Sequence, residues 1–263
     1  MTQKPWDGGD NIGCKRIIKL WRDDEAQNWA SKKKWPAPRA AKLIMSKTTY
    51  WIRRSKRHMI LAATAITITY LLYAATPPPD VRHRLSMGTA YAGLIFLAVS
   101  LWLGPWNVLR RHFNPVSFDL RRDIGIWTGV LAILHTAVGL TVHLRGRMWT
   151  YFFQRLHPLK LQNTLFGFAN FVGLGAAILL LMLLAISNDI SVRALGLRRW
   201  KSLQQWTYAV FGLTATHAIG YQLIEKRRFT WVVLFAVPTI AVLVGQGFGF
   251  FQVRARRSQS AAD

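Results

Sequence analysis

Six apolar segments, each close to the length needed to cross a lipid bilayer, dominate this chain of 263 residues. A spanning helix needs about 20 mostly apolar residues, because its backbone polar groups must be satisfied within the helix once water is absent. The segments of this kind are 59–75, 87–104, 124–143, 164–187, 206–223 and 229–250. The first is short, the fifth contains polar residues, and Pro105 follows the second, where its helix is expected to stop. The sequence therefore predicts an all-α polytopic membrane protein, folded as a six-helix transmembrane bundle.

The positions of the basic residues predict an orientation. Of the 35 Lys and Arg residues, 26 fall on one side of the predicted membrane and nine on the other. Because cytoplasmic loops are richer in Lys and Arg, both termini are expected in the cytoplasm. The net charge of +24 lies between apolar segments and accompanies no RNA-binding motif or zinc spacing, so no nucleic-acid partner is expected. A lone Cys14 excludes an internal disulfide and a cysteine-ligated cluster.

Residues 1–57 form a basic, Trp-containing extension that includes KKKWPAPR (32–39) and WIRRSKR (51–57). Such an arm either meets anionic membrane lipids through its Lys and Arg side chains or docks on a larger membrane complex. A secretory signal is not expected, because the polar region before the first apolar segment is too long. The predicted organisation is the cytoplasmic extension 1–57, a transmembrane domain 58–250 and a short basic cytoplasmic tail 251–263.

Two histidines, His135 and His217, lie inside apolar segments, the third and the fifth. An ionisable residue at membrane depth is costly and is a functional candidate by default. The two segments are expected to run in the same direction. His135 lies 12 residues beyond Asp123 and His217 lies 16 beyond Lys201, an axial offset of only about 6 Å. Two imidazoles at matching depth suit the two axial positions of one heme.

Other interpretations of this pair remain open at this point. Each histidine is also able to form a hydrogen bond across the bundle without holding a metal. Zinc is disfavoured, because it needs three or four ligands and no carboxylate or thiol lies at this depth. Small residues near both histidines would leave room for a flat macrocycle. They are Ala132, Gly139, Gly212, Ala218 and Gly220.

Two sequence stretches resemble the ferric-reductase-like transmembrane family. RRDIGIWTGVLAILH (121–135) is similar to the third helix of that family, and RRWKSLQQWTYAVFGLTATH (198–217) is similar to its fifth. In pattern, the chain is most similar to bacterial heme-binding membrane subunits that pair with sulfite-oxidase-like or methionine-sulfoxide reductases. The resemblance covers about residues 58–250 and implies heme b, a bacterial inner membrane, and His135 and His217 as axial ligands of the heme iron.

The chain also departs from the family pattern. Gln204 and Arg121 occupy the positions that hold inner-heme histidines in two-heme relatives, so one heme is expected, in the outer half. Only 13 residues follow the last apolar segment, and no dinucleotide-binding glycine motif is present, so no fused FAD or NADPH domain is expected.

The basic residues after the third segment are candidates for a second role at a heme. Arg145 and Arg147 lie at the predicted outer boundary, together with Lys226, Arg227 and Arg228 from the last outer loop, and could pair with heme propionates. His143 is interpreted as an interfacial residue, with a propionate contact or a substitute ligand as alternatives. The remaining histidines, His58, His83, His112 and His157, are expected in solvated or interfacial positions.

The function that these features imply is electron transfer. A membrane subunit would pass electrons from quinol or a flavoprotein to an outer-side acceptor through one bis-histidine heme, as a component of an oxidoreductase with a redox partner protein. Six-coordinate iron has no open position for substrate, so no catalytic residue is expected. The alternative is a structural or accessory subunit of a larger membrane complex that keeps the fold without redox turnover. An ion or proton carrier is disfavoured, because no Asp or Glu lies inside the apolar segments.

Overall fold

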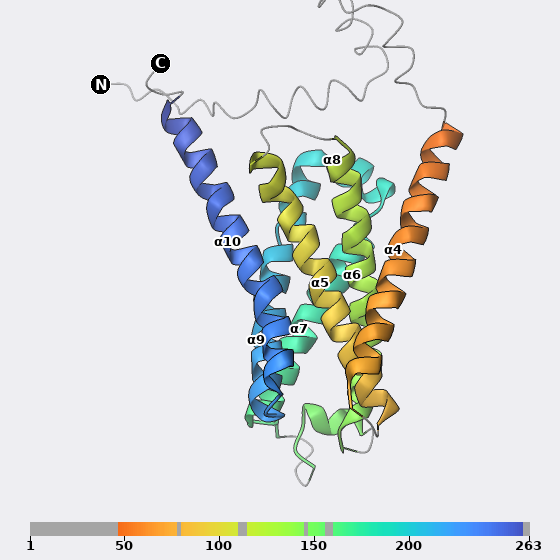
Figure 1. Cartoon of the computed structure of the whole chain (residues 1–263), viewed down its shortest axis with the longest axis vertical. Helices are drawn as coiled ribbons and strands as arrows, with labels where there is room; N and C mark the ends of the chain where they lie inside the picture. Colours follow the sequence, from red (N-terminus) through yellow and green to blue (C-terminus); the bar gives the residue numbers. More distant parts are fainter. Residues whose placement is uncertain (1–46, 78–79, 110–114, 145–146, 156–159, 260–263) are drawn as a thin grey trace, which may run out of the picture. The chain divides into compact units, whose positions relative to one another are not determined.

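The computed structural model describes residues 47–77, 80–109, 115–144, 147–155 and 160–259, and within them all regular elements are helices (Figure 1). The elements are α4 (Lys47–Ala75), α5 (Val81–Leu109), α6 (Pro115–Val142), η2 (Met148–Tyr151), α7 (Leu165–Ala185), α8 (Asp189–Gln204), α9 (Thr207–Ile224) and α10 (Phe229–Gln259). The chain divides into two compact units, 1–56 and 57–263. Everything below concerns the second unit, apart from the first residues of α4.

Five of the described helices are long and apolar enough to cross a membrane. These segments are Trp51–Ala75, Val81–Leu109, Asp119–Val142, Leu165–Ala185 and Phe229–Gln252. The segment 206–223 forms the helix α9, which is not among the five, so the count of six spans stays a prediction. The chain is a helical, multi-pass membrane protein. Its outward surface fits a lipid environment, because large apolar side chains such as Met59, Ile240 and Leu243 are exposed.

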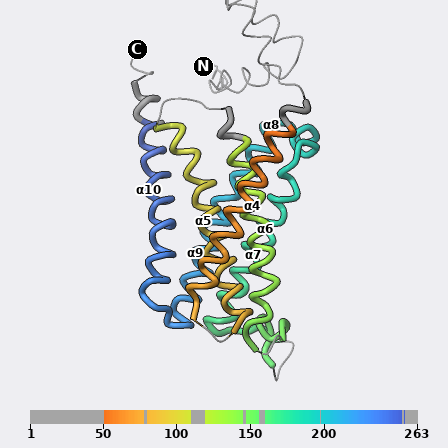
Figure 2. The backbone as a smooth tube through the Cα atoms, turned by 45° about the vertical axis from the view of Figure 1, so that its right-hand side comes forward, coloured from red at the N-terminus to blue at the C-terminus, as the bar shows by residue number. Residues whose placement is uncertain are grey.

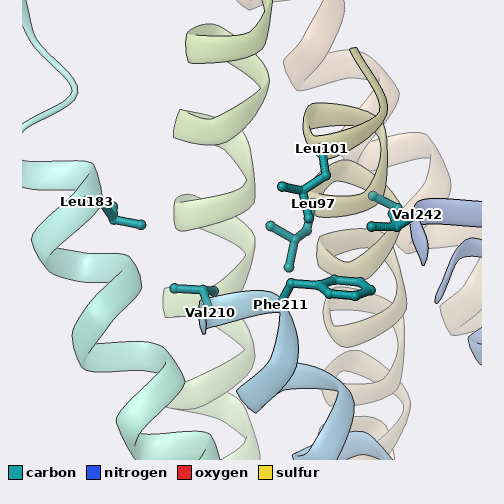
Figure 3. Packing of buried hydrophobic residues seen from close by; sticks show 7 residues of the cluster. Leu97, Leu101, Leu183, Val210, Phe211 and Val242 are labelled. Carbon is teal, nitrogen blue, oxygen red and sulfur yellow. The ribbon is translucent and has the colours of Figure 1, made fainter. Parts of the chain in front are cut away.

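Successive long helices run in alternate directions and stand side by side, so α6 and α9 point the same way (Figure 2). Side chains from four helices form one of the apolar clusters between them (Figure 3). Leu97 and Leu101 come from α5, and Leu183, Phe211 and Val242 come from α7, α9 and α10. A second cluster joins Ala65 of α4 to α5 and α6. These contacts hold α6, α7 and α9 around the cavity described below.

One expectation about helix ends is wrong. Pro105 does not stop the second helix, since α5 continues through it to Leu109. Proline removes only one backbone donor, and it is tolerated in membrane helices where neighbouring groups satisfy the carbonyl that is left free. The connection between α7 and α9 also differs from a simple loop, because it contains the helix α8. Asn188 caps α8 by accepting a hydrogen bond from the Ser191 amide at 2.8 Å, and Gly196 interrupts it with a φ of 74°.

Candidate functional site

His135 on α6 and His217 on α9 face each other across a cavity, with ring centroids 6.2 Å apart and ring planes at 76°. Both rings line this cavity, which lies between α5, α6, α7 and α9 and contains about 1440 Å³ of unfilled space when its open side is counted. We call it the outer cavity, after the side of the membrane on which the sequence predicts this end of the bundle to lie. The structure thus brings together the two histidines that the sequence singled out.

Each imidazole is oriented by a backbone carbonyl from a neighbouring helix. His135 Nδ1 lies 3.0 Å from the carbonyl oxygen of Ser86 on α5, and His217 Nδ1 lies 2.8 Å from that of Ala169 on α7. A carbonyl only accepts hydrogen bonds, so in the neutral rings Nδ1 carries the proton and Nε2 keeps its lone pair. This arrangement, with Nδ1 donating to a second group, is the usual one for histidines that bind a metal through Nε2.

Glycine provides the space for one of the two rings. A β-carbon at Gly173 of α7 would lie 2.4 Å from His217 Nδ1, so any side chain there would displace the imidazole. Gly139, which was expected to leave room near His135, is 3.8 Å from that ring by the same measure, and Ala132 and Ala218 line the cavity. The two other small residues expected at the site have different surroundings. Gly220 packs on Ala169, and Gly212 has nothing within 4 Å.

The pair has the spacing that one metal ion between two imidazoles requires. A metal–imidazole bond is about 2 Å and the ring nitrogen lies about 1 Å from the ring centre, which places the two centres about 6 Å apart. In the described part of the chain, no group of three His, Cys, Asp or Glu residues could hold a metal ion alone. The donor set of two neutral imidazoles in a largely apolar cavity therefore fits an iron whose other four ligands belong to a macrocycle.

A charged cluster lies at one end of the outer cavity. Glu225, the C-cap of α9, accepts from His143 Nε2 at 3.2 Å and pairs with Arg227 at 2.6 Å, and all three residues line the cavity. Burial alone would raise the pKa of the Glu225 carboxyl, but the hydrogen bond from His143 and the charge of Arg227 outweigh it and lower the pKa. His143 is therefore part of a half-buried polar cluster, with Glu225 and Arg227 as its other members.

Tyrosines complete this end of the cavity. Tyr151 of η2 accepts from the His143 amide at 2.7 Å, and burial raises the pKa of its hydroxyl. Tyr221 stacks on His143 at 6.0 Å between centroids, and its hydroxyl donates to Asn170 Oδ1 at 2.9 Å. These contacts connect η2, α7 and α9 beside the histidine pair.

The basic residues predicted to meet heme propionates have varied positions. Arg147 is exposed and precedes η2, and it is not among the residues that line the cavity, whereas Arg145 lies outside the described residues. Lys226 and Arg228 are exposed. Of the five candidates, Arg227 alone is placed by the structure in the cavity wall.

Of the four remaining histidines, the structure describes His58 and His83. His83 lines the outer cavity. His58 on α4 is half-buried, with Nε2 3.4 Å from Asp123, and its Nδ1 accepts from Trp127 Nε1 at 3.3 Å. His112 and His157 lie outside the described residues. His58 therefore belongs to a contact between α4 and α6.

Sequence reasoning missed Gly173, the carbonyls of Ser86 and Ala169, and Glu225 as a partner of His143. Glu225 was visible as an acidic residue at the end of the fifth segment. Gly173 lies in an apolar run with several small residues, and nothing in the local sequence distinguishes it. Backbone carbonyls carry no sequence signal at all.

A second cavity, which we call the inner cavity, lies at the opposite end of the bundle. Arg121 and Gln204, the residues at the positions of the inner-heme histidines in the resembled family, both line it. Gln204 is the last residue of α8, and α9 begins only at Thr207, so the stretch 198–217, which resembles one helix of that family, is divided between two helices.

Part of the chain is similar in sequence to proteins that are named as heme-binding. The chain is 32% identical over 143 residues to the protein-methionine-sulfoxide reductase heme-binding subunit MsrQ of Xanthomonas euvesicatoria pv. vesicatoria (strain 85-10), and 31% identical to that of Xanthomonas oryzae pv. oryzae (strain MAFF 311018). Each match covers 54% of this chain and 58% of the relative. No family model and no solved structure matches the chain. Over little more than half its length, the chain is thus similar to heme-binding subunits of a protein-methionine-sulfoxide reductase.

Proposed function

We propose that the chain is a heme-binding electron-transfer subunit of a bacterial inner membrane, with His135 and His217 as the axial ligands of one heme b. The observation that carries this proposal is the facing pair of imidazoles, 6.2 Å apart, with both Nδ1 atoms bonded to carbonyls. The relatives named as heme-binding subunits support it. When bound, heme supplies reversible one-electron redox chemistry.

The residues of the chain have separate tasks in this proposal. His135 and His217 present Nε2 lone pairs from two helices, and the carbonyls of Ser86 and Ala169 keep both rings in that orientation. Two protein ligands leave no open position at the metal, which favours electron transfer over substrate chemistry. Arg227 takes the role predicted for Arg147 and Arg145, that of meeting an acidic propionate, because it lines the cavity.

The wider setting of the proposal follows the sequence predictions. It comprises six spans, cytoplasmic termini, a quinol or flavoprotein donor and an outer-side acceptor protein. The outer cavity lies at the end where α6 and α9 finish, which is the outer side if the termini are cytoplasmic.

The test is an absorption spectrum of the purified full chain with its heme quantified. We expect a reducible six-coordinate spectrum with about one heme per chain, and a loss of more than tenfold in heme content in both His135→Ala and His217→Ala. His58→Gln, which changes a histidine outside the cavity, should keep its heme. Full heme loading in both alanine variants would refute the ligand assignment, and stable heme-free wild-type protein would favour a structural subunit instead.

A further inference from the structure

The inner cavity has an unbalanced positive charge. It is lined by residues of α5, α6, α7, α8 and the start of α9, and no Asp or Glu is among the described residues that line it. Three cations do line it, Arg121, Arg122 and Lys201. Arg122 is buried and already paired, at 2.6 Å from Asp189 and 3.9 Å from Asp119.

The other two cations have no such partner. Neither Arg121 nor Lys201 forms an ion pair with any residue in the described part of the chain. Arg121 is half-buried, and its Nη1 would lie 3.7 Å from a β-carbon at Gly104, so the guanidinium lies close to α5. A half-buried guanidinium without a counter-charge is costly, and a ligand with negative charge would remove that cost.

Lys201 is exposed, and its neighbour anchors the helix that carries it. Trp200 is buried, and its Nε1 donates to the carbonyl oxygen of Ile186 at 2.8 Å, which holds α8 against the end of α7. Lys201 and Gln204, both on α8, line the cavity from that side, while Arg121 lines it from α6. Two cations therefore approach one space from two elements.

The rest of the wall contains both apolar and neutral polar side chains, and the leucines form its apolar part. The leucines that line the inner cavity come from α5 and α7, and they are Leu97, Leu103, Leu180, Leu183 and Leu184. A small hydrophilic anion would make no favourable contact with these leucines. An anion that carries an apolar chain matches both the cations and the leucines.

We propose that the inner cavity binds the phosphate headgroup of an anionic phospholipid, with Arg121 and Lys201 at the phosphate and an acyl chain along the leucines. Arginine binds phosphate oxygens in a bidentate manner, and lysine adds a compact point charge. Basic pockets between membrane helices on the cytoplasmic side are a known form of lipid headgroup site, and this cavity lies at the predicted cytoplasmic end. A neutral quinone would leave both cations without a counter-charge.

The experiment uses the full chain, purified in detergent and freed of lipid. Thermal unfolding and native mass spectrometry are followed with added dioleoyl-phosphatidylglycerol, dioleoyl-phosphatidylcholine or inorganic phosphate. We expect phosphatidylglycerol to bind and raise the unfolding temperature, and the zwitterionic lipid and inorganic phosphate to have at most a small effect. Arg121→Gln and Lys201→Gln should each weaken phosphatidylglycerol binding about tenfold.

The matched control is Arg198→Gln. Arg198 is exposed on α8 and does not line the cavity, so its removal lowers the net charge equally but should leave lipid binding unchanged. Arg121→Lys, which keeps the charge, should bind more tightly than Arg121→Gln and provides a test if the latter does not fold. The readout does not require heme, so this proposal and the proposed function can fail separately.

Several outcomes would overturn the proposal. Equal binding of the two lipids would show that charge is not recognised, and equal losses in Arg121→Gln and Arg198→Gln would show a diffuse charge effect. A full effect of inorganic phosphate alone would assign the site to a soluble anion. Stabilisation by a neutral quinone, unchanged in Arg121→Gln, would make the cavity a quinone site.

Discussion

The outer and inner cavities are lined by several of the same helices but by different chemical groups. On α6, His135 faces the outer cavity and Arg121, about four turns earlier, lines the inner one. His217 of α9 also lines the outer cavity, and Gln204, the last residue of α8, lines the inner one. In the outer cavity the two residues are imidazoles, which can donate an electron pair to a metal ion when neutral. In the inner cavity they are a permanently charged guanidinium and an amide.

The difference shows what makes a pair of side chains into a metal site. In the outer cavity both Nδ1 atoms are occupied by carbonyls, and Gly173 leaves space for the His217 ring. In the inner cavity Gln204 Nε2 makes only a long contact, 3.4 Å, to Ser187 Oγ, and Arg121 offers donors without a lone pair. The first arrangement favours a metal ion and the second an anion.

Among variants that keep both proposed iron ligands, Gly173→Ala is expected to have the largest effect on heme affinity. The added β-carbon would lie 2.4 Å from His217 Nδ1, so the ring must move and lose its bond to Ala169. Because disturbing the groups that orient a metal-binding histidine costs about 10–100-fold in affinity, we expect heme affinity to fall at least tenfold. Heme titration of the apoprotein measures it.

The control is Gly212→Ala on α9, where a β-carbon meets nothing within 4 Å. Alanine is the better helix former, by about 0.5–1 kcal/mol, so this variant should bind heme normally and be no less stable. If Gly173→Ala binds heme as tightly as Gly212→Ala does, then heme binding does not depend on the present position of the His217 ring.

The next effect concerns the charged cluster at the outer cavity. Glu225→Gln removes the carboxylate that holds His143 and Arg227, and we expect the free energy of unfolding at pH 7 to fall by about 1–2 kcal/mol. Because the pKa of Glu225 is lowered on folding, its contribution is present above the ordinary carboxyl pKa of about 4.3 and is lost as the pH falls through the folded value.

The difference between wild type and Glu225→Gln should therefore shrink below about pH 4, measured by thermal unfolding at several pH values. Asp80→Asn serves as the comparison, since Asp80 is exposed and caps only the Arg82 amide at 2.9 Å. A Glu225→Gln defect that stayed constant from pH 7 to pH 3.5 would show that shape, and not charge, stabilises the cluster.

These two sites also show how far sequence reasoning reached. The apolar segments predicted the long helices, because backbone satisfaction in lipid leaves few alternatives. The depth of His135 and His217 predicted that they meet, because helical rise is constant along a span. Sequence did not predict that Arg227 rather than Arg147 lines the cavity, since the course of a connecting loop depends on contacts such as that of Glu225 with Arg227.

Other features depend on packing between distant helices. Gly173 matters because α7 passes close to the His217 ring, a distance that no local pattern encodes. The helix α8 begins after the Asn188 cap and is interrupted at Gly196, in the stretch between the fourth and fifth predicted segments.

A smaller effect is expected from Ser86→Ala. The Ser86 hydroxyl oxygen lies 3.3 Å from His135 Nδ1, while the stronger contact, 3.0 Å, is to the carbonyl that the variant retains. Loss of a weak secondary hydrogen bond of roughly 0.5–1 kcal/mol should lower heme affinity about twofold to fivefold. Thr64→Val, which removes an exposed hydroxyl from α4, should leave it unchanged. A loss beyond tenfold in Ser86→Ala would make the hydroxyl, and not the carbonyl, the main partner of His135.

The smallest expected effect is that of Gln204→Ala on heme. Gln204 lines only the inner cavity, and its side chain contacts Ser187 near the end of α7, remote from either imidazole. The two cavities adjoin, because Leu97, Thr128 and Leu180 line both of them. The polar residue among these three, Thr128, donates its hydroxyl to the Ile124 carbonyl and not to a histidine. Heme content and spectrum should therefore equal those of the wild type. A changed spectrum in Gln204→Ala would mean that the inner cavity also contacts the bound group, and the division into a metal site and an anion site would have to be abandoned.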